Sequence, residues 1–259
     1  MAGSVELSRD EACAVIQISN PGKLNAIDAL MWQRLAELLA ELTADGDLRC
    51  LVLRGAGDEA FSSGADIGDF AERRSNSAQA IAFAEPVHRA FATLQAFPVP
   101  TLAAITGVCA GGGLELAACC DLRVCTTESR FGIPINKMGA TLCHAELRPL
   151  LAAVGPNVAL ELLLEGRMLG ADEALIKGLV TRSVAPDAFE AEIAATVRRL
   201  VSGAPLAARW HKSFVRRLQR PEPLSQAETR EGFACFDTED YRHGVRAFLD
   251  RTRPRFQGR

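Results

Sequence analysis

The chain has 259 residues and a mass of 27.8 kDa, and its 29 basic and 32 acidic residues leave a formal net charge of −3. An apolar fraction of 48% is that of an ordinary globular protein and excludes wholesale disorder. The slightly acidic balance argues against a nucleic-acid-binding protein, in which basic residues gather in excess. One α/β domain can occupy a chain of this length.

Short apolar runs and helical patterns alternate in the first half of the chain. Strands are expected over residues 5–7, 14–18, 50–53, Thr101–Ile105 and 122–125. Helices are expected over residues 28–42 with Asp28 as the N-cap, over 78–96 with a kink or break at Pro86, and over Gly112–Cys119. Residues 55–68 are rich in glycine, serine and aspartate and are expected to form a loop. Strands that alternate with helices pair in parallel.

The second half of the chain is mostly helical, with glycine or proline between most of the predicted helices. They are expected over residues 145–154, 157–164, 171–177, 188–202, 205–218, 225–233 and 238–250. No linker divides the sequence. We therefore predict one α/β core domain over residues 1–195 and a helical C-terminal region over residues 196–259.

The eight cysteines are expected to be reduced thiols in a cytoplasmic protein, because the first residues show no secretory-signal pattern. Cys120 and Cys125 are loosely at metal-ligand spacing, but no second pair matches them, so we expect no metal site. Residues 90–114 carry no charge and are long enough to span a bilayer. Pro98 and Pro100 interrupt that stretch, and we expect no membrane association.

Residues 55–60 fit the loose dinucleotide-binding pattern Gly-x-Gly-x-x-Ala. That pattern requires a helix directly after it, so that the helix N-terminus meets the pyrophosphate. More turn-forming residues follow here instead, and nucleotide binding of this kind is not favoured.

Two glycine-containing loops, residues 60–67 and 107–115, each follow a predicted strand. Three consecutive glycines, 111–113, stand before a helix, where a ligand can approach bare backbone and where the first N–H groups are unpaired. With a second N–H from the other loop, such a site can hold a developing oxyanion. For either loop alone, a tight turn with close helix–strand packing is the favoured explanation.

Several motifs resemble those of the crotonase, or enoyl-CoA hydratase/isomerase, superfamily, and they follow one another in the order found in that family. They lie at residues 20–27, 60–67, 98–107, 111–118, 121–124, 131–134, 169–174 and 178–180. The resemblance implies an α/β spiral of ββα units and an acyl-CoA substrate, with coenzyme A as part of the substrate and no other cofactor. It also implies a homo-oligomer, a trimer or a dimer of trimers, with the C-terminal helices packing on the core, on neighbouring subunits or on both.

The resemblance also assigns site residues. The backbone N–H groups of Ala65 and Gly112 would hold the thioester carbonyl. The coenzyme A side of the site would be lined by Lys23, Leu24, Ala26, Asp66, Ile67 and Gly68. Arg251, after the last helix, matches a region where the family often carries a basic residue near the coenzyme A phosphates, although a solvated arginine is an equal alternative.

Glu115 is the expected acid/base, one turn into the helix that begins at the glycine triplet. The best-known hydratases carry a second glutamate, whose position is Ile135 here, so hydration by a carboxylate pair is in doubt. His144, near a predicted helix start, is a candidate second group. Phe70 and Phe83 are candidates for the acyl pocket, and core packing explains them equally well.

These features predict an enoyl-CoA hydratase that adds water to a 2-enoyl-CoA. Decarboxylation of a malonyl-type CoA and thioester hydrolysis are alternatives that need less from a second carboxylate. A non-catalytic acyl-CoA-binding member of the family is the third possibility.

Overall fold

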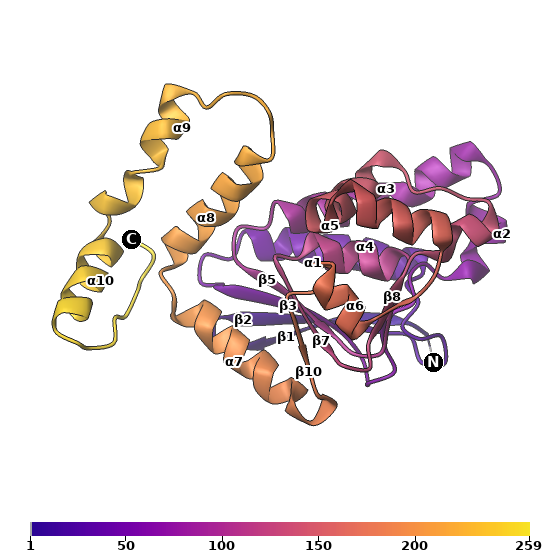
Figure 1. Cartoon of the computed structure of the whole chain (residues 1–259), viewed down its shortest axis with the longest axis horizontal. Helices are drawn as coiled ribbons and strands as arrows, with labels where there is room; N and C mark the ends of the chain where they lie inside the picture. Colours follow the sequence, from indigo (N-terminus) through magenta and orange to yellow (C-terminus); the bar gives the residue numbers. More distant parts are fainter. Residues whose placement is uncertain (1) are drawn as a thin grey trace.

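Two β-sheets form the centre of the computed structural model, which describes residues 2–259 (Figure 1). The larger sheet has the order β1-β2-β3-β5-β7-β10, and the smaller has the order β4-β6-β8-β9. The strands of the larger sheet are β1 (Ser4–Asp10), β2 (Cys13–Ser19), β3 (Cys50–Gly55), β5 (Thr101–Ile105), β7 (Leu122–Thr126) and β10 (Arg182–Val184). Those of the smaller are β4 (Ala60–Ser62), β6 (Val108–Ala110), β8 (Arg130–Gly132) and β9 (Leu169–Gly170).

From β3 to β10 the chain winds as a spiral in which each turn contributes one strand to each sheet. The strand pairs β3/β4, β5/β6 and β7/β8 are followed by α3 (Ser77–Gln95), α4 (Gly112–Cys119) and α5 (His144–Glu165), respectively. Successive turns pair in parallel within both sheets. This is the predicted spiral of ββα units.

The prediction of a loop over residues 55–68 was wrong in one respect, because β4 lies within it. All three residues of β4 are buried, and it pairs with β6. Three residues are too few for a strand period to show in the sequence.

Helices cover the larger sheet on both faces. On one face lie α1 (Ala29–Thr43), α3, α4 and α5, and on the other lies α7 (Phe189–Ser202), whose Phe189 and Ile193 pack against buried sheet residues (Figure 1). Asp28 caps α1 as predicted, since its Oδ1 accepts a hydrogen bond from the Met31 N–H at 2.9 Å. The predicted break at Pro86 is absent: α3 is one helix across it, because residues on both sides pack on the same core.

The uncharged stretch 90–114 is divided among the end of α3, β5, β6 and the beginning of α4, so it is not a single helix. Within residues 2–259 one helix, α5, has the length and composition of a membrane span. Gly155, with φ 71° and ψ 174°, interrupts α5 and gives the two helices that the sequence predicts.

The last helices leave the layered body as an extended arm, made of α8 (Pro205–Leu218), α9 (Gln226–Glu231) and α10 (Glu239–Leu249) (Figure 1). Lys212 and Arg216 of α8 pair with Asp121, at 2.5 Å and 3.0 Å, and so fasten the base of the arm to the core. The predicted boundary between residues 195 and 196 falls within α7, which is continuous there and packs on the sheet. The division of the chain at residue 195 stays a prediction.

Two short helices complete the fold. They are α2 (Phe70–Arg73), which follows the loop after β4, and α6 (Ala171–Ile176), which follows β9. A 3-10 turn over Pro134–Met138 connects β8 to the loop before α5. The loop after β4, α2, this 3-10 turn and the beginnings of α4 and α5 lie around one cavity.

Candidate active site

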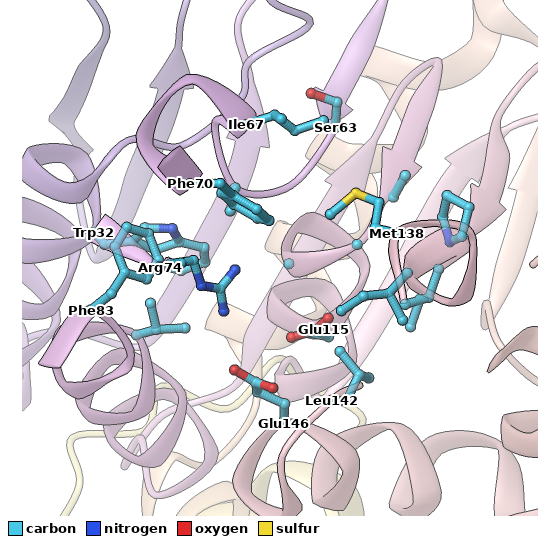
Figure 2. Close-up of a pocket in the computed structure, with 18 residues that line it drawn as sticks. Trp32, Ser63, Ile67, Phe70, Arg74, Phe83, Glu115, Met138, Leu142 and Glu146 are labelled. Carbon is cyan, nitrogen blue, oxygen red and sulfur yellow. The ribbon is translucent and has the colours of Figure 1, made fainter. Parts of the chain in front are cut away.

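A cavity of about 800 Å³, a volume that includes its opening to solvent, lies where these segments meet (Figure 2). Its walls are mainly apolar. Apart from the indole of Trp32, only four lining side chains are polar or charged. The polar members are Ser63, Arg74, Glu115 and Glu146; the apolar side chains are those of Trp32, Ala65, Ile67, Phe70, Phe83, Val87, Ala110, Ile133, Pro134, Ile135, Met138 and Leu142. Phe70 and Phe83 thus line the cavity.

Two backbone N–H groups lie side by side at the cavity wall. A Cβ placed on Gly112 would lie 3.6 Å from the Ala65 nitrogen, so the beginning of α4 passes close to the loop after β4. Neither the Ala65 N–H nor the Gly112 N–H has a hydrogen-bond acceptor within residues 2–259. Both donors are therefore available to an oxygen atom of a ligand, at the positive end of a helix.

Glycines make this close approach possible. Gly64 has φ +100°, and a Cβ on it would lie 2.9 Å from the Gly112 nitrogen. A Cβ on Gly113 would lie 2.5 Å from the Ser62 carbonyl oxygen. The glycine triplet therefore serves both close packing and the binding site. Close packing of α4 on β4 brings the Ala65 and Gly112 amides next to each other.

Glu115 lies in the first turn of α4 with 4% of its surface exposed, and its carboxyl group faces the cavity (Figure 2). Burial and, to a lesser degree, the negative charge of Glu146 raise the pKa of this carboxyl group to about 8, against a smaller opposing effect of Arg74. Glu115 is therefore protonated at neutral pH. A neutral carboxylic acid in this place can donate a proton to a bound ligand.

Glu146, in the first turn of α5, is a second cavity carboxylate that the sequence analysis did not single out (Figure 2). Its Oε2 accepts a hydrogen bond from the Cys143 N–H at 2.7 Å, and its Oε1 lies 3.4 Å from His88 Nε2. A glutamate three residues after a helix N-cap is a recognisable capping signal. That signal does not show which way the capped helix points, and so it does not place Glu146 beside Glu115.

The structure does not place His144 in the cavity. It is the first residue of α5 and is exposed, because two residues along a helix turn the side chain about 200° away from Glu146. The histidine that contacts Glu146 is His88 of α3. Ile135, at the position of the second family glutamate, lines the cavity as an apolar side chain.

His88, Cys143 and Glu146 also form the group with metal-ligating potential within residues 2–259. Their ligand atoms all lie within 4.8 Å of one another, and His88 Nε2 is 3.2 Å from Cys143 Sγ. Nitrogen, sulfur and oxygen donors of this kind suit zinc. Hydrogen bonds among the same atoms account for the arrangement equally well, and the absence of a metal site stays a prediction.

The residues assigned to the coenzyme A side form a partly exposed rim beside Ala65. Lys23 Nζ pairs with Asp66 Oδ2 at 2.5 Å, and Asp66 Oδ1 accepts a hydrogen bond from the Gly68 N–H at 3.0 Å. Leu24 and Ile67 are exposed, whereas Ala26 is buried. A bridge between Ile27 and Ala65 joins the two segments.

Arg251 does not belong to this rim in the single chain. It follows α10 in the arm, at the opposite end of the molecule from α2 (Figure 1). The resemblance located it by sequence order alone, and the arm carries it away from the cavity of its own chain.

Free backbone amides beside a buried, protonated carboxyl group define an enzyme of the class that stabilises an oxyanion while moving a proton. The comparisons with known proteins agree. A family model described as Enoyl-CoA hydratase/isomerase matches residues 8–259. The chain belongs to this enoyl-CoA hydratase/isomerase family.

Individual relatives cover almost the whole chain. The short-chain-enoyl-CoA hydratase of Clostridium acetobutylicum is 30% identical over 96% of this chain and 95% of its own length, and the crotonyl-CoA hydratase of Syntrophomonas wolfei is 30% identical over 98% and 97%. A solved structure described as an enoyl-CoA hydratase/carnithine racemase from Magnetospirillum magneticum is 45% identical, with a TM-score of 0.96 over 98% of this chain and 96% of that one.

Proposed function

We propose that this protein is an enoyl-CoA hydratase in which Glu115 and Glu146 together add water to a 2-enoyl-CoA. The observation that carries the proposal is the presence of two carboxyl groups, from α4 and α5, in one cavity beside two free backbone amides. Homologues named as enoyl-CoA and crotonyl-CoA hydratases support the same reaction.

The amides of Ala65 and Gly112 donate hydrogen bonds to the thioester oxygen of the bound substrate. They stabilise the negative charge that develops on this oxygen as an enolate forms, and one such donor contributes about 3–4 kcal/mol to lowering the barrier. This polarisation makes the β-carbon open to attack by water.

The two glutamates divide the proton transfers between them. Glu146, as the carboxylate, accepts a proton from the attacking water, whose oxygen bonds to the β-carbon while the π electrons move toward the thioester oxygen. Glu115, as the neutral acid, gives its proton to the α-carbon when the enolate collapses. The net reaction adds one water, and later proton exchange between the two glutamates restores the starting state. His88 holds Glu146 in place.

The rim residues Lys23, Leu24, Asp66, Ile67 and Gly68 are proposed to contact the coenzyme A moiety, which is part of the substrate. The proposed hydration uses no cofactor besides coenzyme A. The free cysteine thiols suit a reducing, cytoplasmic compartment.

A homo-oligomer, a trimer or a dimer of trimers, is also proposed. The arm exposes large apolar side chains, with Phe248 84% and Leu249 73% exposed, and a neighbouring subunit would cover them. Arg251 lies beside these residues in sequence, so it would contact coenzyme A only in a neighbouring subunit.

Decarboxylation and thioester hydrolysis are less favoured than the sequence alone indicates. At the position of the second family glutamate this chain has Ile135, which carries no carboxylate. Glu146 of α5 supplies a second carboxylate to the same cavity. Hydration requires a second acid/base group, whereas decarboxylation and thioester hydrolysis need less from one.

Product analysis tests the proposal. We expect purified protein to convert 2-enoyl-CoA esters to 3-hydroxyacyl-CoA esters, detected by mass, with no free CoA or CO2 released. Glu115→Gln should lower kcat by about 100- to 10,000-fold while acyl-CoA binding persists. Glu72→Gln, at an exposed glutamate of α2, is the matched control and should retain activity. Unchanged turnover in Glu115→Gln would refute the assignment.

A further inference from the structure

Arg74 is a cation inside an otherwise apolar part of the cavity. It follows α2 directly, and its guanidinium carbon lies 4.6 Å from the centre of the Phe70 ring and 4.8 Å from the centre of the Phe83 ring. Figure 2 shows the guanidinium group pointing from this aromatic wall into the cavity. Two aromatic faces hold the group in position without neutralising its charge.

The donors of Arg74 have no acceptor in the protein. Within residues 2–259 its guanidinium forms no ion pair and no hydrogen bond, although Glu115 and Glu146 line the same cavity. Its influence on the Glu115 carboxyl group is weaker than that of Glu146, so the pKa of Glu115 remains raised despite it. Arg74 therefore offsets the burial of Glu115 only in part, and its own donors remain without a protein acceptor within residues 2–259.

A second donor on the same wall is also without a partner. Trp32 is 1% exposed and lines the cavity, and its Nε1 is buried with no hydrogen-bond partner within the described residues. Figure 2 shows Trp32, Phe83 and Arg74 together on this wall. Buried donors are nearly always satisfied in folded proteins, so the Trp32 Nε1 is an exception. Arg74 is half-buried, and its guanidinium faces the cavity, where an acceptor on a ligand can pair with it.

The acceptor that fits a guanidinium best is a carboxylate, which it binds through two parallel hydrogen bonds. The acyl chain is the part of the substrate that occupies this region, because the amides hold the thioester and the rim faces coenzyme A. We propose that Arg74 binds a carboxylate carried by the acyl chain, so that the preferred substrates are 2-enoyl-CoA thioesters of dicarboxylic acids. This inference rests on the proposed function, which it narrows to a substrate class.

Ligand binding tests the inference without turnover. Calorimetric titration of the wild-type protein should show glutaryl-CoA, which carries a terminal carboxylate, binding roughly 10- to 100-fold more tightly than pentanoyl-CoA. Arg74→Met should remove this preference and leave pentanoyl-CoA binding unchanged. Arg73→Met, at the exposed neighbouring arginine, should keep it. Equal binding of both esters by the wild type overturns the inference, and that result needs no variant to fold.

Equal weakening of both esters by Arg74→Met also overturns it, because Arg74 would then contact coenzyme A or support the fold. Kinetics give an independent readout. The wild-type kcat/KM for 2-pentenedioyl-CoA should exceed that for 2-pentenoyl-CoA, and Arg74→Met should abolish this difference. A protein that hydrates neither ester but binds glutaryl-CoA selectively contradicts the proposed reaction and supports the role of Arg74.

Discussion

At the scale of single residues, environment gives two chemically identical side chains different roles. Glu115 is buried in α4 without a hydrogen bond from its carboxyl group to a described residue, so its neutral form is favoured. Glu146 accepts a hydrogen bond from the Cys143 amide and lies beside His88, which suits a carboxylate. A buried carboxyl group whose pKa is raised can act as the acid beside a second carboxyl group in the same cavity.

The raised pKa of Glu115 predicts an alkaline limit to activity. The acid form is present below a pH of about 8, so kcat/KM should fall as pH rises through that value. Glu146→Gln removes the neighbouring negative charge, so the pKa of Glu115 should be lower. In the remaining activity of this variant, the alkaline fall of kcat/KM should therefore move to lower pH. Steady-state pH profiles of both proteins measure this shift. A limb at the same pH in both would contradict the coupling.

At the scale of elements, the site depends on how closely α4 packs on β4. The glycines at the beginning of α4 let the helix approach the loop after β4 until the Gly112 and Ala65 amides lie side by side. The helix places Glu115 one turn further on, on the same cavity wall. One packing contact thus positions the oxyanion donors and the proton donor together.

Gly113→Ala tests this contact. Its Cβ would meet the Ser62 carbonyl oxygen at 2.5 Å, so α4 must shift, and the free energy of unfolding should fall by about 1–3 kcal/mol. Because the amides move with the helix, kcat should fall by more than the loss of stability explains. Denaturant unfolding and kinetics on the folded variant measure the two effects. Gly46→Ala, where a Cβ meets nothing within 4 Å, is the control and should leave both unchanged.

At the scale of the whole molecule, the arm contrasts with the layered body. The body buries a large apolar core between helices and sheets, whereas α8 has no buried residue and α10 leaves Phe248 exposed. Ion pairs to Asp121 hold the base of the arm on its own core. The core of the same chain does not cover the rest of the arm's apolar surface. Assembly into an oligomer would bury it.

Phe248→Asp should weaken that assembly, because a charge would enter an apolar interface. Size-exclusion chromatography with light scattering should show the wild type as a trimer or hexamer and the variant shifted toward the monomer. Ile176→Asp is the matched control, since Ile176 lies on α6 of the body and is 85% exposed, as Phe248 is 84% exposed. Identical masses for the wild type and Phe248→Asp would contradict this use of the arm.

Local pattern alone predicted much of the fold. The main helices and five of the six strands of the larger sheet follow from apolar periodicity, capping residues and turn signals, whereas β10 was not predicted. The strands of the smaller sheet have two or three residues each, and their pairing partners are distant in sequence, so no local period shows them. The continuity of α3 through Pro86 likewise depends on packing of both halves on one core.

Local sequence was enough to predict the parts of the site that lie within a few residues of one another: the glycine triplet, the amide of Gly112 and Glu115 one turn later. Contacts between distant segments bring Glu146 from α5, Arg74 from beyond α2 and Trp32 from α1 to the same cavity, and they leave His144 outside it. A helical pattern shows which residues share a face, but the direction of that face is set by contacts between segments far apart in the chain. Burial, and with it the charge state of Glu115, follows from those contacts.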